Sequence, residues 1–167
     1  METKTAVAAL EGDELRLVAR TGSGHTIVMD SAEADTGPRP AELLLVAQAG
    51  CTAMDVLSIL RKKRQPLTRY EVRVAGDQRD DPAPHVFEVI RIVHVVEGAV
   101  DPEAVRRAIE LSATRYCTVS ANLASGVAEI HHALLIRNPD GNELYRVVAV
   151  TGPAGRQSVQ HTVAIGS

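Results

Sequence analysis

The chain has 167 residues, of which 45% are hydrophobic and 2% aromatic, and its formal net charge at pH 7 is −3. This size and composition predict a single domain, residues 1–167, with one aliphatic core. The weak charge, with basic residues scattered apart from 61–64, argues against a nucleic-acid partner, and the shortage of aromatic rings argues against base stacking.

Residues 4–30 contain three short apolar runs separated by Gly-containing turns. This spacing predicts N-terminal strands in an antiparallel meander. The first ten residues lead directly into an acidic turn, so we expect no secretory signal. We also expect no stretch that approaches the roughly 20 apolar residues of a membrane-spanning helix. The chain is therefore expected to be cytoplasmic, with reduced thiols and no membrane partner.

Residues 41–63 predict a long central helix that follows a polar, proline-containing loop. Its apolar residues cover most of the helical circumference, which is typical of a helix buried in a core. One modest subunit would hardly bury such a helix, so we expect a homodimer in which two copies pack together. The polar residues of the helix follow three-and-four spacing and share one stripe: Gln48, Cys51, Thr52, Asp55 and Ser58.

The second half of the chain alternates strands and helices. A hairpin is predicted over 68–97, followed by helices over 101–126 that are interrupted around 116–118. Two C-terminal strands over 127–150 flank an Asn-Pro-Asp-Gly turn, and the extension 151–167 reads as another strand or a tail. The fold class is therefore α+β with antiparallel strands.

The only two cysteines, Cys51 and Cys117, are the candidate reactive groups. A thiol is reactive as a thiolate, which a cation or a helix N-terminus stabilises. Cys117 lies where the helix restarts, so the helix dipole favours its ionisation, whereas Asp55 one turn beyond Cys51 discourages ionisation there. The residues alone thus favour Cys117 as the easier thiolate. Both thiols as buried structural groups remain an alternative.

Three segments carry a family resemblance, and the cysteines in them are 66 positions apart. Together they resemble the OsmC/Ohr family over about residues 25–137, and its OsmC-like branch more than the organic hydroperoxide resistance proteins. The segments are Gly24-His-Thr-Ile-Val-Met-Asp30, Arg39-Pro-Ala-Glu-Leu-Leu-Leu with Gly50-Cys-Thr-Ala-Met-Asp-Val56, and Tyr116-Cys-Thr-Val-Ser120.

The resemblance implies an intertwined OsmC-like homodimer, with antiparallel sheets wrapped around long central helices and two active sites at the subunit interface. It implies thiol-dependent reduction of organic or fatty-acid hydroperoxides, with Cys51 as the peroxidatic and Cys117 as the resolving thiol. A dithiol or lipoyl-type reductant would restore the thiols, and no cofactor is implied. A non-catalytic module of the same fold that binds a small apolar ligand at the interface is the alternative.

Peroxidase members use an N-terminal arginine, held by a glutamate near the start of the long helix, to activate the thiol. Glu42 resembles that glutamate, but nine residues place it opposite Cys51 on a straight helix. Either the helix bends near Gly50 or Glu42 is only a first-turn acid. The candidate arginines are Arg16, Arg20 and Arg39.

Three further residues are candidates to line a pocket: His25, Gln48 and Asp55. Metal ligation is not expected from the sequence. His131 and His132 are adjacent, so in a strand they face opposite sides, and His85 and His94 are isolated.

Overall fold

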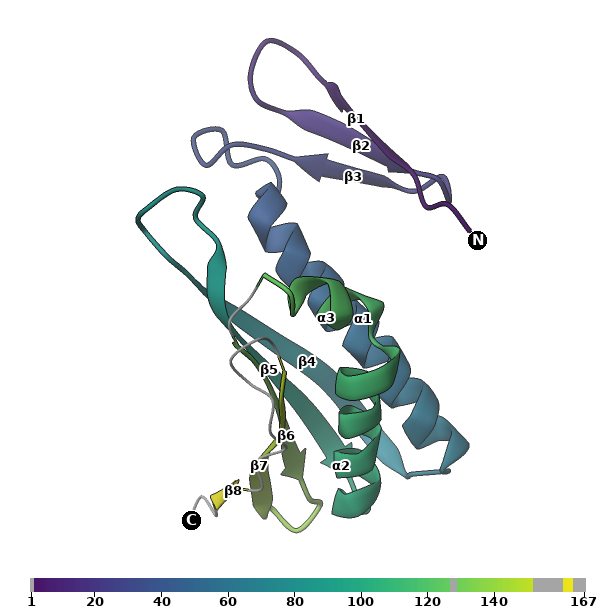
Figure 1. Cartoon of the computed structure of the whole chain (residues 1–167). Helices are drawn as coiled ribbons and strands as arrows, with labels where there is room; N and C mark the ends of the chain where they lie inside the picture. The colour runs from purple at the N-terminus through teal and green to yellow at the C-terminus, as the bar shows by residue number, and fades with distance from the viewer. Residues whose placement is uncertain (1, 127–128, 152–160, 164–167) are drawn as a thin grey trace. The chain divides into compact units, whose positions relative to one another are not determined.

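The computed structural model describes residues 2–126, 129–151 and 161–163. The chain divides into two compact units, residues 1–44 and residues 45–167. Figure 1 shows the helices and strands of each unit.

The first unit holds a three-stranded antiparallel sheet of β1 (Ala6–Leu10), β2 (Leu17–Thr21) and β3 (Thr26–Met29), in the order β1-β2-β3. The predicted meander is thereby confirmed. After β3, the buried Asp30 carboxylate accepts hydrogen bonds from the Ser31 N–H and from both the N–H and the hydroxyl of Thr36. The Thr36 hydroxyl is the main cause of the lowered pKa of Asp30. Asp30 therefore organises the loop that precedes the long helix.

Helix α1 (Pro40–Lys62) begins with a proline and ends with Arg61 and Lys62, within one residue of both predicted ends. By length and composition it is apolar enough to cross a membrane, which corrects the expectation that no segment would be. The core helix of a soluble protein can have the same length and apolar composition. The buried side chains of α1 recur every fourth residue, on one face: Gln48, Thr52, Val56 and Leu60.

A single chain buries only part of α1, as expected from the sequence for one modest subunit. Met54 is 76% exposed and Val46 is 62% exposed, whereas the polar Gln48 and Thr52 are fully buried. Ser58, expected on the same polar stripe, is exposed. One face of α1 therefore packs inside the subunit and another remains uncovered.

The second unit contains a five-stranded sheet in the order β4-β5-β6-β7-β8. Its strands are β4 (Leu67–Gln78), β5 (Phe87–Gly98), β6 (Glu129–Arg137), β7 (Glu143–Thr151) and β8 (His161–Val163). Both predicted hairpins, β4 with β5 and β6 with β7, are confirmed. Strands β5 and β6 pair in parallel, so this sheet is mixed and not purely antiparallel. The helical connection between them allows this, because parallel strands need a long crossover.

In the C-terminal extension, β8 pairs antiparallel with β7, which confirms a further strand at residues 161–163. The rest of the extension, residues 152–160 and 164–167, lies outside the described residues.

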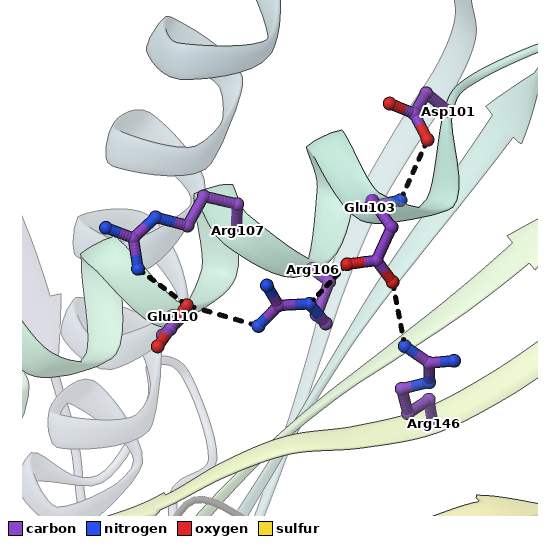
Figure 2. Close-up of polar contacts among 6 residues, drawn as sticks. All are labelled: Asp101, Glu103, Arg106, Arg107, Glu110 and Arg146. Atoms are coloured by element: carbon purple, nitrogen blue, oxygen red, sulfur yellow. Dashed lines mark hydrogen bonds and ion pairs between the residues drawn. The ribbon is translucent and has the colours of Figure 1, made fainter. Parts of the chain in front are cut away.

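Helix α2 (Pro102–Leu111) starts as the sequence predicts, since the Asp101 carboxylate accepts the Glu103 N–H at 3.0 Å. Glu103 then pairs with Arg106 at 2.7 Å and with Arg146 of β7 at 3.0 Å (Figure 2). These contacts tie the first turn of α2 to the sheet. Figure 2 also shows Glu110 bonded to Arg106 and Arg107.

The core of the second unit lies between α1, α2 and strands β5 to β7. It contains aliphatic side chains from all five elements, as the composition predicts. Its buried members are Val56, Leu60, Val96, Val100, Ala104, Val105, Ala108, Ile109, Leu134, Ile136 and Val148. This packing holds α1 beside the end of α2, where the helical segment that carries Cys117 begins.

Candidate functional site

The structure brings together two cysteines that are distant in the sequence. Cys51 lies in the middle of α1 and is half-buried, whereas Cys117 is only 3% exposed, and both are free thiols. The two Sγ atoms and a carboxylate oxygen of Asp55 all lie within 4.8 Å of one another. Cys51 and Asp55 share a helix face because they are four residues apart.

A π-helical turn, η1 (Ser112–Tyr116), positions Cys117. The Cys117 N–H donates to the Ser112 carbonyl at 2.9 Å, a bond that spans five residues and ends the turn. Cys117 itself is extended, with φ −69° and ψ 101°, and becomes the N-cap of α3 (Thr118–Leu123). The predicted interruption of the helix is thus confirmed at Cys117.

The Cys117 sulfur accepts hydrogen bonds from two donors. The Ser120 N–H lies 3.4 Å from Sγ, and the Gln48 amide nitrogen Nε2 lies 3.8 Å from it. Gln48 Nε2 also donates to the Ser120 hydroxyl at 2.7 Å. Gln48 was predicted as a pocket residue, and here it orients Cys117 and Ser120 from the buried side of α1.

The surroundings of Cys51 oppose its ionisation. Burial raises the pKa of the Cys51 thiol, and the nearby Cys117 thiol and Asp55 carboxylate raise it further, against a hydrogen bond from the Val119 backbone that lowers it. This agrees with the sequence-based argument that Asp55 discourages a Cys51 thiolate. An activated Cys51 therefore needs a positive charge in addition to these neighbours.

A buried chain of hydrogen bonds holds Asp55. Ser112 Oγ donates to Asp55 Oδ2 at 3.0 Å and lies 2.9 Å from Thr52 Oγ1. Thr52 Oγ1 lies 3.4 Å from His94 Nε2, and His94 Nδ1 lies 2.7 Å from the Tyr70 hydroxyl.

An Asp55 carboxylate can only accept hydrogen bonds. This fixes which group donates and which accepts at every step of the hydrogen-bond series. Tyr70 then donates to His94 Nδ1, His94 Nε2–H donates to Thr52, and Thr52 donates to Ser112. Burial and the nearby His132 lower the pKa of His94 to about 3, so its ring is neutral, as this direction requires.

Sequence reasoning found Thr52 but missed three members of this chain: Tyr70, His94 and Ser112. The sequence indicates two of them only through the pairing of two strands. Tyr70 pairs with Val96, and His94 pairs with Val72, so Tyr70 and His94 are diagonal neighbours on one face of the hairpin.

The candidate activating residues all lie in the first unit. Arg16 is bonded to Thr36 at 3.2 Å and ion-paired with Glu11, while Arg20 is an exposed residue of β2. The role of these arginines at Cys51 stays a prediction. His25 is exposed, and its backbone N–H donates to the Thr21 hydroxyl at 3.2 Å.

Glu42 is bonded within its own segment. Its carboxylate accepts the Arg39 N–H at 2.7 Å and lies 3.6 Å from the Arg39 guanidinium, which also pairs with Asp35 at 3.0 Å. These contacts support Glu42 as a first-turn acid, and the role of Glu42 and Arg39 at Cys51 stays a prediction.

Comparisons with known proteins show which family the chain belongs to. A family model described as "OsmC-like protein" matches residues 32–131. Protein YhfA of Escherichia coli K12 is 39% identical over 118 residues, which cover 70% of this chain and 87% of YhfA.

Two solved structures are informative. A hypothetical protein from Aquifex aeolicus VF5 is similar with a TM-score of 0.74 and 30% identity, over 83% of this chain and 98% of that one. A putative organic hydroperoxide resistance protein from Vibrio cholerae is similar with a TM-score of 0.60 and 14% identity, over 80% of this chain and 92% of that one. The second likeness shows a shared fold.

Proposed function

The chain belongs to the OsmC-like protein family, and from this membership we propose that it reduces organic or fatty-acid hydroperoxides to alcohols through Cys51 and Cys117. The observation that carries the proposal is the convergence of the two sulfurs within 4.8 Å from positions far apart in the sequence. The hydroperoxide resistance protein of the same fold supports it.

The difference in exposure between the two thiols supports the roles proposed for them. Cys51 is the more accessible sulfur, so it meets the peroxide, whereas Cys117 is buried behind it. The N–H groups of Ser120 and Gln48 point at the Cys117 sulfur and would stabilise negative charge there while it attacks. Under this proposal the helix-dipole argument for Cys117 and the family pattern for Cys51 are compatible, because a resolving thiol also acts as a nucleophile.

The reaction proceeds in three balanced steps. The Cys51 thiolate attacks the peroxide, so an S–O bond forms, the O–O bond breaks, and the alkoxide leaves as an alcohol after taking a proton. Cys51 is now a sulfenic acid, oxidised by two electrons. Cys117 attacks this sulfur, forming the disulfide and releasing water. A dithiol or lipoyl-type donor returns both thiols and is itself oxidised to a disulfide.

The proposal includes a homodimer in the reducing cytoplasm. The uncovered apolar side chains of α1, Val46 and Met54, would pack against a second copy of the chain. The positive charge that Cys51 needs would come from the partner chain or an N-terminal loop, with Arg16, Arg20 and Arg39 as the candidates.

Consumption of cumene hydroperoxide tests the proposal, with dihydrolipoamide as reductant and the Cys51→Ser and Cys117→Ser variants alongside. We expect Cys51→Ser to abolish turnover. Cys117→Ser should lose turnover but retain one equivalent of reaction, with a sulfenic acid on Cys51 that dimedone traps. Unchanged activity of Cys51→Ser would contradict the proposal.

A specific observation favours the alternative module that binds a small apolar ligand. The raised pKa of Cys51, beside Asp55, leaves little thiolate unless a cation is supplied. Absence of turnover by the wild-type protein with both dihydrolipoamide and dithiothreitol would favour this binder over the enzyme.

A further inference from the structure

We propose that Cys51, Asp55 and Cys117 form a three-ligand site for a thiophilic divalent cation such as Zn²⁺ when both thiols are reduced. Two thiolates and one carboxylate would occupy three tetrahedral positions, and water would take the fourth. The inference goes beyond peroxide reduction, since it needs only the reduced site.

The distances among the three groups suit such a site. All three ligand atoms lie within 4.8 Å of one another. Zinc binds sulfur at about 2.3 Å and carboxylate oxygen at about 2.0–2.2 Å, so tetrahedral ligands lie roughly 3.5–3.8 Å apart. Side-chain adjustments on the order of 1 Å therefore close the site around the ion. The half-buried Cys51 gives the ion a route in.

The hydrogen bonds behind Asp55 are a second, independent observation. Ligating carboxylates and histidines are usually fixed by outer partners, which orient them for the metal. Here Ser112 donates to Asp55 Oδ2 at 3.0 Å, and Thr52 and His94 support Ser112 from the buried side. Asp55 Oδ1 makes no hydrogen bond within the described part of the chain, so it is available to a cation.

The negative charges of the three ligand groups also favour a divalent cation. Two thiolates and a carboxylate bring three negative charges into a small, partly buried volume, and a divalent cation compensates two of them. Among the described residues, no ion pair involves Asp55. A divalent cation would therefore supply the positive charge that these three ligand groups lack within the described part of the chain.

The ligand set also predicts selectivity. Soft thiolate ligands favour Zn²⁺ and Cd²⁺, whereas Mg²⁺ and Ca²⁺ prefer sites made of oxygen atoms. A bound cation would occupy both sulfurs and thereby prevent their oxidation. Zinc should accordingly inhibit peroxide consumption, and a chelator should restore it.

Titration of the reduced, full-length protein with Co²⁺ and Zn²⁺ tests the site without any peroxide. We expect one ion per chain, sulfur-to-cobalt charge-transfer absorption in the near ultraviolet, and displacement of Co²⁺ by Zn²⁺. Zinc, but not Mg²⁺, should slow iodoacetamide labelling of both thiols. A competing chromogenic chelator gives the zinc affinity.

Variants identify the ligands, and circular dichroism checks that each is folded. Cys51→Ser and Cys117→Ser should each lose the charge-transfer band of the wild-type complex. Asp55→Asn should keep a thiolate band but bind zinc more weakly, and Ser112→Ala should weaken zinc binding by about 10- to 100-fold through the orientation of Asp55.

The matched control is His131→Ala, because His131 and Glu129, 2.7 Å apart, could also capture zinc at the surface. Its zinc affinity should equal that of the wild type. Wild-type affinity in Cys51→Ser, loss of binding in His131→Ala, or cobalt binding without a sulfur band would each overturn the proposal. Failure of the peroxidase reaction alone would not, since these measurements need no turnover.

Discussion

The two sides of α1 differ in a way that reverses the usual pattern of a globular protein. On the inner side, which faces the core, Gln48 and Thr52 are completely buried and make hydrogen bonds. On the outer side, Val46 and Met54 are largely exposed. Polar side chains are buried in proteins when they have partners, and large exposed apolar side chains that cluster mark interaction surfaces. The inner side of α1 is thus held by hydrogen bonds between polar side chains, whereas the outer side presents apolar side chains that the proposed homodimer would bury.

The largest expected effect comes from a charge on the outer side. Burial of a methionine contributes about 1.5–3 kcal/mol, and a lysine in its place must also lose hydration around its charge. We therefore expect Met54→Lys to weaken the proposed homodimer by at least about 100-fold, as measured by sedimentation velocity.

Val86→Lys is the control for this change, because Val86 is an exposed apolar residue outside α1, at 38% exposure. It should leave the dimer intact. A wild-type protein that is monomeric at all concentrations, or a dimer of Met54→Lys with unchanged affinity, would mean that the outer side of α1 is not the interface.

Acid should lower the free energy of unfolding through the histidines buried beside the inner side of α1. The pKa of His94 is about 3 in the folded protein, below its usual 6.5, so the unfolded chain binds the proton first as the pH falls. The stability from neutral His94 is complete above about pH 6.5 and declines toward pH 3, with a loss of about 2 kcal/mol by pH 5. His132, whose pKa burial lowers to about 4, adds to the same decline.

Urea denaturation at pH 7.5 and pH 5 measures this loss. The free energy of unfolding of His94→Asn should differ less between the two pH values than that of the wild type. This comparison does not depend on the absolute stability of the variant. His85→Asn, in an exposed residue, should match the wild type. An equal difference in the wild type and His94→Asn would contradict the assignment.

A smaller effect is expected from removing one hydroxyl of the inner side. Thr52→Val keeps the side-chain shape but leaves His94 Nε2 without its acceptor, which costs about 1–3 kcal/mol. Ser58→Ala removes a hydroxyl from an exposed position of the same helix, so it should change the free energy of unfolding by less than about 0.5 kcal/mol. Equal effects of the two variants would show that the inner hydrogen bonds contribute little.

Much of the fold follows from local patterns in the sequence. The ends of α1, the Asp101 cap and both predicted hairpins depend on residues near one another, and all were predicted. The parallel pairing of β5 with β6 was not, because it depends on where a long helical crossover returns the chain. The expectation that no segment is apolar enough to span a membrane was wrong for α1, whose charged residues are few along 23 positions.

The candidate site was predicted in part. The polar stripe of α1 indicated Gln48, Cys51 and Asp55, and the interrupted helix indicated Cys117. In the sequence His94 is isolated from other candidate ligands, and its partners Thr52 and Tyr70 come from other elements. Hydrogen bonds between distant elements have no fixed spacing in the sequence, so only the folded arrangement reveals them.

The π-helical turn before Cys117 lets the chain carry one more residue without losing the meeting of the two sulfurs. Its hydrogen bond from the Cys117 N–H to the Ser112 carbonyl spans five residues, where an α-helical bond spans four, so the wider turn takes up the additional residue. Removing one residue between Ser112 and Tyr116 would leave an ordinary α-helical turn and keep Cys117 directed toward α1. Relatives that keep this chemistry should accordingly tolerate a single-residue gap in this segment.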